Sequence, residues 1–314
     1  MKSSTPSQPF QAFMAGLIDY AGLFPPASLD LTSALDEYGA YLPSADSWML
    51  GRFIIPAADL SKLPILSAAW RFSVLGRSGK DADEFLRNLE VDLADVQAFR
   101  QTQPATADIF EVRLPSDILS FPTKLFNLLN QTSQQITSQH KLTAFYEIPL
   151  DDAWRENMTA TIAALSQQNG QNSRHSGFKL RCGGVVAHAF PAVEQVAHAL
   201  LLCRDHRVPF KATAGLHHPI RHYNESVQTK MHGFINVFGA AILARAHNLS
   251  LEQIIEILSE EDPRHFDFNE SHFAWKNIFA TAEEIADARK SQFIAYGSCS
   301  FDEPREDMQK LSWL

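Results

Sequence analysis

Cysteine is scarce in this sequence. The 314 residues contain only three, Cys182, Cys203 and Cys299, which are far apart and odd in number. None lies in a CxxC pair, so the sequence indicates neither a disulfide framework nor a cysteine-based metal motif. This usage suits a reducing compartment, and we expect a cytoplasmic protein. We interpret Cys182 and Cys299 as small buried residues of the core.

The chain also lacks an excess of positive charge and any long apolar run. Its 27 Lys and Arg residues against 36 Asp and Glu residues give a net charge of -9, which argues against a general nucleic-acid-binding surface. No apolar run is long enough to span a bilayer. Asp19 and Tyr20 interrupt the apolar part of the first 27 residues, which therefore do not resemble a signal peptide. We expect no nucleic-acid partner and no membrane partner.

Apolar residues, 45% of the chain, recur in short strand-like runs that alternate with helical patterns. Strands alternating with helices favour βαβ units and a parallel sheet. The sequence thus predicts an α/β fold, a (β/α)8 TIM-type barrel, and the alternative is an open doubly wound sheet, although no GxGxxG follows an early strand. Seven strands are predicted at 51–57, 70–76, 108–114, 142–148, 177–182, 208–214 and 293–299.

The eighth strand and the chain ends are less clearly marked. Either 265–269 or 234–238 could supply the strand, but 231–248 has an unbroken helical pattern that stops near Asn248. We predict a single domain over 1–314, with N-terminal cap helices over 1–48, the barrel over 49–314 and extra C-terminal helices from about 250 to 290.

Two of the predicted strands carry a lysine inside an apolar run. "GFKLRC" contains Lys179 and "VPFKATA" contains Lys211. Side chains alternate along a strand, so Lys179 shares a face with Arg181, and Lys211 shares one with Thr213. Consecutive barrel strands are neighbours, and both lysines would then converge near the C-terminal mouth, where such barrels have their active sites. The alternative is that each lysine reaches solvent through its flexible stem.

Two carboxylates on neighbouring predicted strands could accompany these lysines. Glu111 lies in "DIFEVRL" and Glu147 in "AFYEIP", and either would offset the cost of burying an ammonium group or would move protons. Desolvation and a nearby cation both favour the free amine, and a free amine attacks a carbonyl to form a Schiff base. The pattern predicts carbonyl chemistry.

The two lysine segments resemble a known family. "FKLRCGG" and "FKATAGLHHPIR" are similar to the two lysine strands of class I aldolases of the deoxyribose-phosphate aldolase type, over about 40 residues. The resemblance implies that Lys179 is the Schiff-base lysine and that Lys211 lowers its pKa. Two departures, Arg181-Cys182 in place of small hydroxyl residues and Leu216-His217-His218 within the second glycine motif, mean that the family's substrate is not carried over.

Further polar residues are candidates for substrate binding and proton transfer. We expect Arg181 and the backbone N–H groups of Gly183 and Gly184 to bind a phosphate or carboxylate. His217 or His218 would transfer protons, because imidazole titrates near neutrality. The remaining candidates for substrate binding are Asp19, Tyr20, Arg221, His232 and Asn236; the alternative for Asp19 is that it caps a backbone end in an N-terminal plug.

These residues support a leading hypothesis and two alternatives. The leading hypothesis is a lyase-like, class I aldolase-like enzyme that acts on a small anionic carbonyl compound and needs no cofactor, its catalytic residues being Lys179, Lys211, Glu147, His217 and His218. The first alternative is a metal-dependent hydrolase or isomerase that uses the histidine-rich segment 215–238, which contains His217, His218, His222 and His232, with Asp19 or Glu147 to bind a divalent metal. The second is a non-catalytic barrel that binds a small anion. A homo-oligomer is possible in each case.

Overall fold

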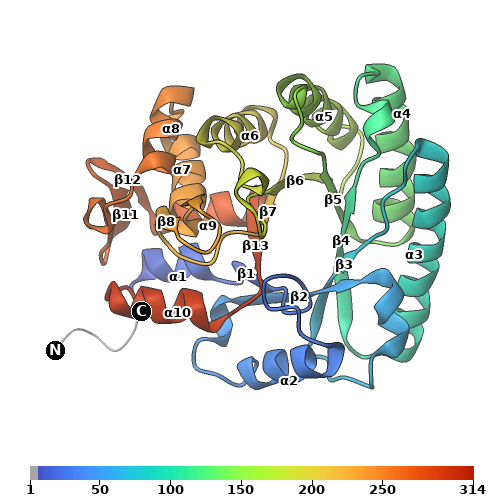
Figure 1. Cartoon of the computed structure of the whole chain (residues 1–314), viewed down its shortest axis with the longest axis horizontal. Coiled ribbons are helices and arrows are strands. Elements are labelled where there is room, and N and C mark those ends of the chain that lie inside the picture. The colour runs from blue at the N-terminus through green and yellow to red at the C-terminus, as the bar shows by residue number, and fades with distance from the viewer. Residues whose placement is uncertain (1–5) are drawn as a thin grey trace. The chain divides into compact units, whose positions relative to one another are not determined.

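The predicted barrel is confirmed by the computed structural model, which describes residues 6–314. Eight parallel strands form a closed sheet in the order β1-β13-β7-β6-β5-β4-β3-β2 (Figure 1). All seven strands expected from the sequence are present: β2 (Leu50–Pro56), β3 (Arg71–Leu75), β4 (Thr106–Arg113), β5 (Thr143–Glu147), β6 (Gly177–Arg181), β7 (Phe210–Thr213) and β13 (Phe293–Ser298). The open doubly wound alternative is therefore wrong.

The eighth strand is not where we expected it. It is β1 (Ile18–Tyr20), within the segment predicted to hold only cap helices, and it pairs with β13 in parallel, Asp19 opposite Gly297. The strand has only three residues, all of them buried, and one is an aspartate. It therefore shows neither alternation nor an apolar run, which are the two sequence signals of a strand.

The described chain divides into two compact units. Unit 1 comprises residues 6–51, 181–204 and 212–314, and unit 2 comprises residues 52–180 and 205–211. The single domain expected from the sequence stays a prediction. Unit 2 carries the strands with the lysines and carboxylates, and unit 1 carries the histidine-rich segment.

Unit 2 pairs its strands with long helices. These are α3 (Ala82–Thr102), α4 (Pro122–Ser133) and α5 (Trp154–Asn169), together with a π-helical turn η4 (Gln134–Gln139) and 3-10 turns η2 (Ala57–Lys62) and η3 (Ser116–Ile118). Asp81 caps α3 by accepting a hydrogen bond from the Glu84 N–H at 2.9 Å. Phe85, Leu89 and Val96 recur at helical spacing and are buried, so they form the face of α3 that packs into the core.

Unit 1 contains the remaining elements. Its helices are α1 (Gln8–Met14), α2 (Leu31–Tyr41), α6 (Val193–His206), α7 (Phe234–His247), α8 (Leu251–Ser259), α9 (Ala282–Ser291) and α10 (Asp302–Lys310), with 3-10 turns η1 (Ser47–Met49), η5 (Ala187–Ala189) and η6 (Pro263–His265). There are also two small antiparallel sheets. One pairs β8 (His222–Asn224) with β9 (Thr229–Met231), and in the other β11 (His272–Trp275) lies between β10 (Phe266–Phe268) and β12 (Ile278–Thr281).

The helix predicted at 231–248 is confirmed from Phe234 onward as α7, whose cap residue Asn248 has a left-handed conformation with φ 51°, whereas Met231 belongs to β9. The prediction that 250–290 is helical is wrong in part. Strands β10, β11 and β12 lie between α8 and α9, because aromatic residues such as Phe266 and Phe273 stack across this sheet. Across residues 6–314, no helix combines the length and apolar character needed to cross a membrane.

Candidate active site

Five polar side chains of unit 2 meet at the strands. Strand alternation brings each of them to the same face, and all are buried: Ser73, Glu111 and Lys211 are 0% exposed, Lys179 is 5% exposed and Glu147 is 9% exposed. We call this group the lysine cluster. It joins β3, β4, β5, β6 and β7, so it lies where five strands contribute one side chain each.

Glu111 is the centre of the lysine cluster. Its Oε2 atom lies 2.8 Å from the Lys179 Nζ atom, and its Oε1 atom accepts a hydrogen bond from Lys211. Ser73 Oγ donates to the same Oε1 atom at 2.5 Å and accepts from Lys211 Nζ at 3.2 Å. The Glu111 carboxylate therefore binds both ammonium groups, and the Ser73 hydroxyl bridges Lys211 and Glu111.

Glu147 adds a second carboxylate at the more exposed end. It is opposite Lys179 in the β5–β6 register, and the Lys179 Nζ atom lies 3.1 Å from its Oε2 atom. Its side chain is 12% exposed, whereas that of Glu111 is fully buried. Solvent or a small ligand therefore reaches the Glu147–Lys179 pair before it reaches Glu111 or Lys211.

The reach of Lys211 shows how strongly these strands curve. β7 is four strands from β3 in the sheet order, a separation of ~19 Å in a flat sheet at ~4.8 Å per strand. Lys211 Nζ nevertheless lies 3.2 Å from Ser73 Oγ. Below Lys179 on the same strand, Gly177 makes room for Phe145, because a Cβ atom there would lie 2.3 Å from the phenyl ring.

The pKa values reflect this pairing. Burial by itself raises the pKa of Glu111, but the charges of Lys179 and Lys211 outweigh it and hold that pKa far below its ordinary value. Burial by itself lowers the pKa of Lys179, but Glu111 and Glu147 outweigh it and raise that pKa. Lys179 is thus an ammonium group in the ligand-free site, and a free amine there requires proton transfer to a neighbour.

The sequence located most of this cluster. Lys179, Lys211 and Glu147 are brought together, and Glu111 was recognised as a candidate acid. The alternative in which the lysines reach solvent is wrong, since both are buried. Ser73 was missed; its only signal is a hydroxyl residue on the alternating face of the apolar run "WRFSVLG".

The predicted anion cradle lies in unit 1. Arg181 is exposed, and its Nε atom donates to the Gly183 carbonyl at 3.0 Å. Gly183 allows a close backbone approach, because a Cβ atom there would lie 2.7 Å from the Gly215 Cα atom. Gly184 lies nearby, 3.7 Å from the guanidinium when measured from its ideal Cβ position. Anion binding by these residues stays a prediction.

Asp19 and Tyr20 lie in β1 and are both fully buried. Asp19 is tightly packed, since a Cβ atom on Gly51 would lie 2.1 Å from its Oδ1 atom. The Tyr20 hydroxyl donates to Glu37 Oε2 at 2.5 Å, and burial together with this bond raises the pKa of Tyr20. Both residues belong to a barrel strand, so they are not part of an N-terminal plug. That they contact substrate stays a prediction.

His217 and His218 both pair with α10. His217 Nδ1 lies 3.0 Å from Glu303 Oε2, and His218 Nδ1 lies 2.5 Å from Asp307 Oδ2. The two acids are four residues apart and therefore share one face of the helix. Both side chains are turned to this face, because α10 offers it two carboxylates.

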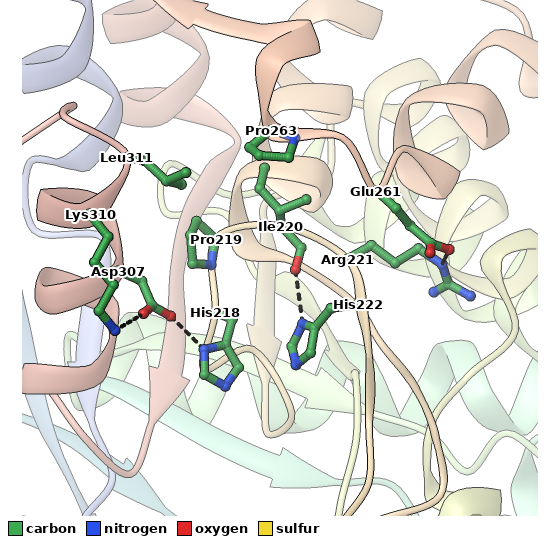
Figure 2. A pocket seen from close by; sticks show the side chains of 10 residues that line it. All are labelled: His218, Pro219, Ile220, Arg221, His222, Glu261, Pro263, Asp307, Lys310 and Leu311. Carbon is green, nitrogen blue, oxygen red and sulfur yellow. Dashed lines mark hydrogen bonds and ion pairs between the residues drawn. The ribbon is translucent and has the colours of Figure 1, made fainter.

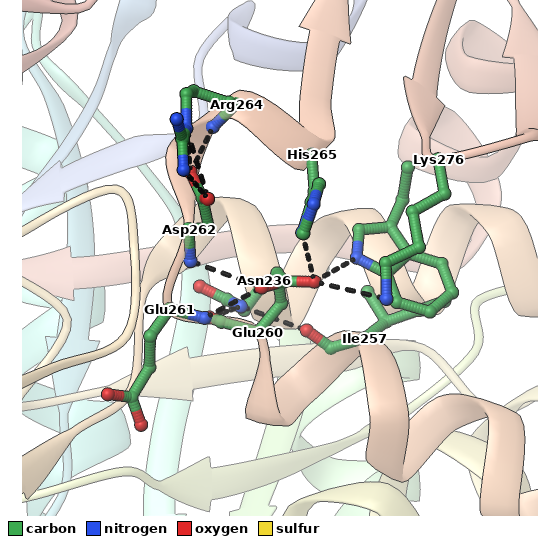
Figure 3. A network of polar contacts seen from close by, with 9 residues as sticks. Asn236, Ile257, Glu260, Glu261, Asp262, Arg264, His265 and Lys276 are labelled. Carbon is green, nitrogen blue, oxygen red and sulfur yellow. Dashed lines mark hydrogen bonds and ion pairs between the residues drawn. The ribbon is translucent and has the colours of Figure 1, made fainter.

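His232 and Asn236 are bonded mainly to the backbone. His232 Nε2 donates to the Pro191 carbonyl at 2.8 Å, and its Nδ1 atom lies 3.3 Å from Arg221. Burial lowers the pKa of His232 to about 4, so its ring is neutral near pH 7. The Asn236 amide donates to the carbonyls of Ile257 and Glu260 at 2.9 and 2.8 Å (Figure 3), and its oxygen accepts from the Arg221 N–H at 2.8 Å.

No set of three or more metal-binding side chains is gathered anywhere in residues 6–314. The four histidines 217, 218, 222 and 232 each use a ring nitrogen on a protein group instead. The divalent-metal alternative therefore gains no support from the arrangement of these residues.

No protein-family model matches this chain, and a search of the curated proteins finds no significant match. The site must be interpreted from its own geometry.

Proposed function

We propose that the lysine cluster is the active site of a lyase-like enzyme that forms a Schiff base with a small anionic carbonyl compound. The observation that carries the proposal is the convergence of Lys179 and Lys211 on Glu111. Two buried ammonium groups are costly, and a packed apolar layer would serve stability at least as well. Buried, mutually perturbed titratable groups are typical of catalytic sites.

Lys179 is the nucleophile in this proposal, because it is the less deeply buried lysine and has a carboxylate on each side. Glu147 accepts a proton from the ammonium group, and the free amine attacks the carbonyl carbon. A proton returned to the carbonyl oxygen lets it leave as water, and a protonated imine remains on Lys179. The imine then takes up the electron pair of the bond between the α and β carbons as that bond breaks, while the β-hydroxyl group gives its proton to Glu147 and its fragment leaves as an aldehyde. Return of that proton to the α carbon and addition of water release the remaining fragment and restore the Lys179 ammonium group.

Lys211 sets the charge of the site. It shares the Glu111 carboxylate with Lys179 and thereby weakens the hold of that carboxylate on the Lys179 proton. Replacing Lys211 with methionine leaves the whole charge of Glu111 to Lys179, which makes the free amine harder to form. This is the role that the aldolase resemblance implies for the second lysine.

Borohydride trapping tests the proposal. The protein is incubated with small oxo acids and with phosphorylated aldehydes, reduced with borohydride and mapped by peptide mass spectrometry. We expect a stable adduct on Lys179 that is lost in Lys179→Met and Lys179→Arg and is kept in Lys62→Met, which removes an exposed lysine. Absence of any adduct on Lys179 and Lys211 over the whole panel would contradict the proposal.

The raised pKa of Lys179 also favours a second candidate, a barrel that binds a small anion without turnover. A permanent ammonium group binds an anion by charge, and arginine supplies that charge equally well. This candidate predicts that anions raise the melting temperature and that Lys179→Arg preserves the effect. Schiff-base chemistry predicts that the same variant loses all adduct formation.

A further inference from the structure

A pocket of about 390 Å³ opens in unit 1 between the segment 218–222, the turn at Pro263 and the end of α10 (Figure 2). Pockets that hold small ligands fall within roughly 300–1,000 Å³. All its lining residues belong to unit 1, and none belongs to the lysine cluster. The function proposed above makes no use of this pocket as a site of its own.

An oriented imidazole lines this pocket. Asp307 Oδ2 holds His218 Nδ1 at 2.5 Å, and Lys310 donates to Asp307 Oδ1 at 2.9 Å. The second ring nitrogen of His218, Nε2, has no hydrogen-bond partner among residues 6–314. A carboxylate that fixes one nitrogen of a histidine presents the other nitrogen to a ligand in a defined direction.

A second imidazole stands beside the first. The rings of His218 and His222 meet edge to face with their centroids 4.5 Å apart, and His222 Nδ1 lies 3.0 Å from the Ile220 carbonyl. His222 is thereby fixed as well. Figure 2 shows the two rings side by side below Pro219 and Ile220.

The charges around the pocket favour an anion. Both of its carboxylates are already engaged: Asp307 by His218 and Lys310, and Glu261 by Lys230 at 2.5 Å. The cationic groups that line the pocket are Lys310, which donates one hydrogen bond to Asp307, and Arg221, whose Nε atom lies 3.9 Å from Glu261. The Nε2 atom of each imidazole becomes a donor when its ring is protonated, and burial lowers the pKa of His222, which leaves His218 as the imidazole for this role. An incoming negative charge meets donors rather than free carboxylates.

The rest of the lining is apolar. Pro219, Ile220, Pro263 and Leu311 supply it (Figure 2). Removing the flat apolar body of a ligand from water against such residues is favourable in proportion to its area. The pocket thus combines an apolar wall with a polar group in a fixed position, the Nε2 atom of His218.

We propose that this pocket binds a small carboxylate with an apolar body. The carboxylate accepts a hydrogen bond from Nε2 of protonated His218, so the imidazolium lies between the ligand and Asp307, and the apolar body packs on Pro219, Pro263 and Leu311. The site is independent of the lysine cluster and does not require the proposed carbonyl chemistry.

Benzoate and benzamide are the probes, because they share a ring and differ in charge. Binding is measured by calorimetry near pH 6 and located through the side-chain nitrogen NMR signals of the histidines. We expect benzoate to move the His218 Nε2 signal, and benzamide to bind about tenfold more weakly, since a hydrogen bond between charged groups is worth at least that factor. His218→Gln weakens benzoate binding to the same extent, and His175→Gln, which alters an exposed histidine, leaves it unchanged.

Lys179→Met separates this proposal from the proposed function, because benzoate binding should survive in it. Equal affinity for the two probes would overturn the proposal, as would unchanged affinity in His218→Gln. A benzoate signal that disappears in Lys179→Met would place the anion site at the lysine cluster and also overturn it. Should His218→Gln not fold, the NMR titration of the native protein decides alone, since a ligand that leaves His218 Nε2 unmoved is bound elsewhere.

Discussion

The lysine cluster of unit 2 and the pair His232 and Asn236 in the histidine-rich segment of unit 1 use buried polar side chains in opposite ways. In the lysine cluster, charged groups pair with charged groups, as when Glu111 holds both lysines. In the histidine-rich segment, His232 and Asn236 hydrogen-bond backbone carbonyls of distant residues. A side chain bonded to the backbone fixes a local fold, whereas paired charges retain protons that can be moved.

The largest expected effect is in the lysine cluster. Glu111→Ala leaves two buried ammonium groups without their common carboxylate, and we expect the free energy of unfolding to fall by about 3–5 kcal/mol. Glu147→Ala is the matched control and should cost less, because Glu147 is partly exposed and contacts only Lys179 of the two lysines. Urea unfolding of both variants measures the difference. A loss below about 1 kcal/mol in Glu111→Ala would contradict the central role of this carboxylate.

Much of the lysine cluster could be predicted because a strand places alternate residues on one face. That rule put Lys179 and Lys211 inward on consecutive strands, and it put Glu111 and Glu147 on the strands before them. It could not identify Ser73, whose role depends on Lys211 reaching over to β3. The curvature that makes this contact possible is a property of the closed sheet and not of either strand.

The histidine-rich segment offers the next test. Asn236→Ala removes two donors to the carbonyls of Ile257 and Glu260 and one acceptor for the Arg221 N–H. We expect the free energy of unfolding to fall by about 1–3 kcal/mol, because buried backbone groups lose their partners. Asn172→Ala is the control; Asn172 is only partly buried and donates one bond to Gln168. Equal losses in the two variants would mean that Asn236 does not hold this segment together.

The role of Asn236 could not be predicted, and the reason is physical. Its partners lie 15 to 24 residues away and are main-chain carbonyl and N–H groups, which every residue has. No pattern of side chains in the sequence predicts which main-chain groups will be the partners of Asn236. The same holds for the bond between His232 and the Pro191 carbonyl. It also holds for β1, whose three residues pair with β13 at the other end of the chain.

The smallest expected effect is the pH dependence of the free energy of unfolding. Near neutral pH, His217 in the histidine-rich segment contributes to it and the lysine cluster does not. Burial lowers the pKa of His217, but contacts with Cys299 and Glu303 outweigh it and raise that pKa to about 9. A raised folded-state pKa contributes stability that is complete below pH ~6.5 and is lost as the pH rises to about 9. Because Glu303 is half exposed, we expect a loss of only about 1 kcal/mol over this interval.

Glu111 and Lys179 have pKa values shifted away from this interval, so they contribute no such slope. Unfolding by urea between pH 6.5 and 8, below the range in which the buried thiols of Cys182 and Cys203 ionise on unfolding, should show a slope that His217→Gln reduces and Glu147→Gln keeps. An unchanged slope in His217→Gln would assign the titration to another group.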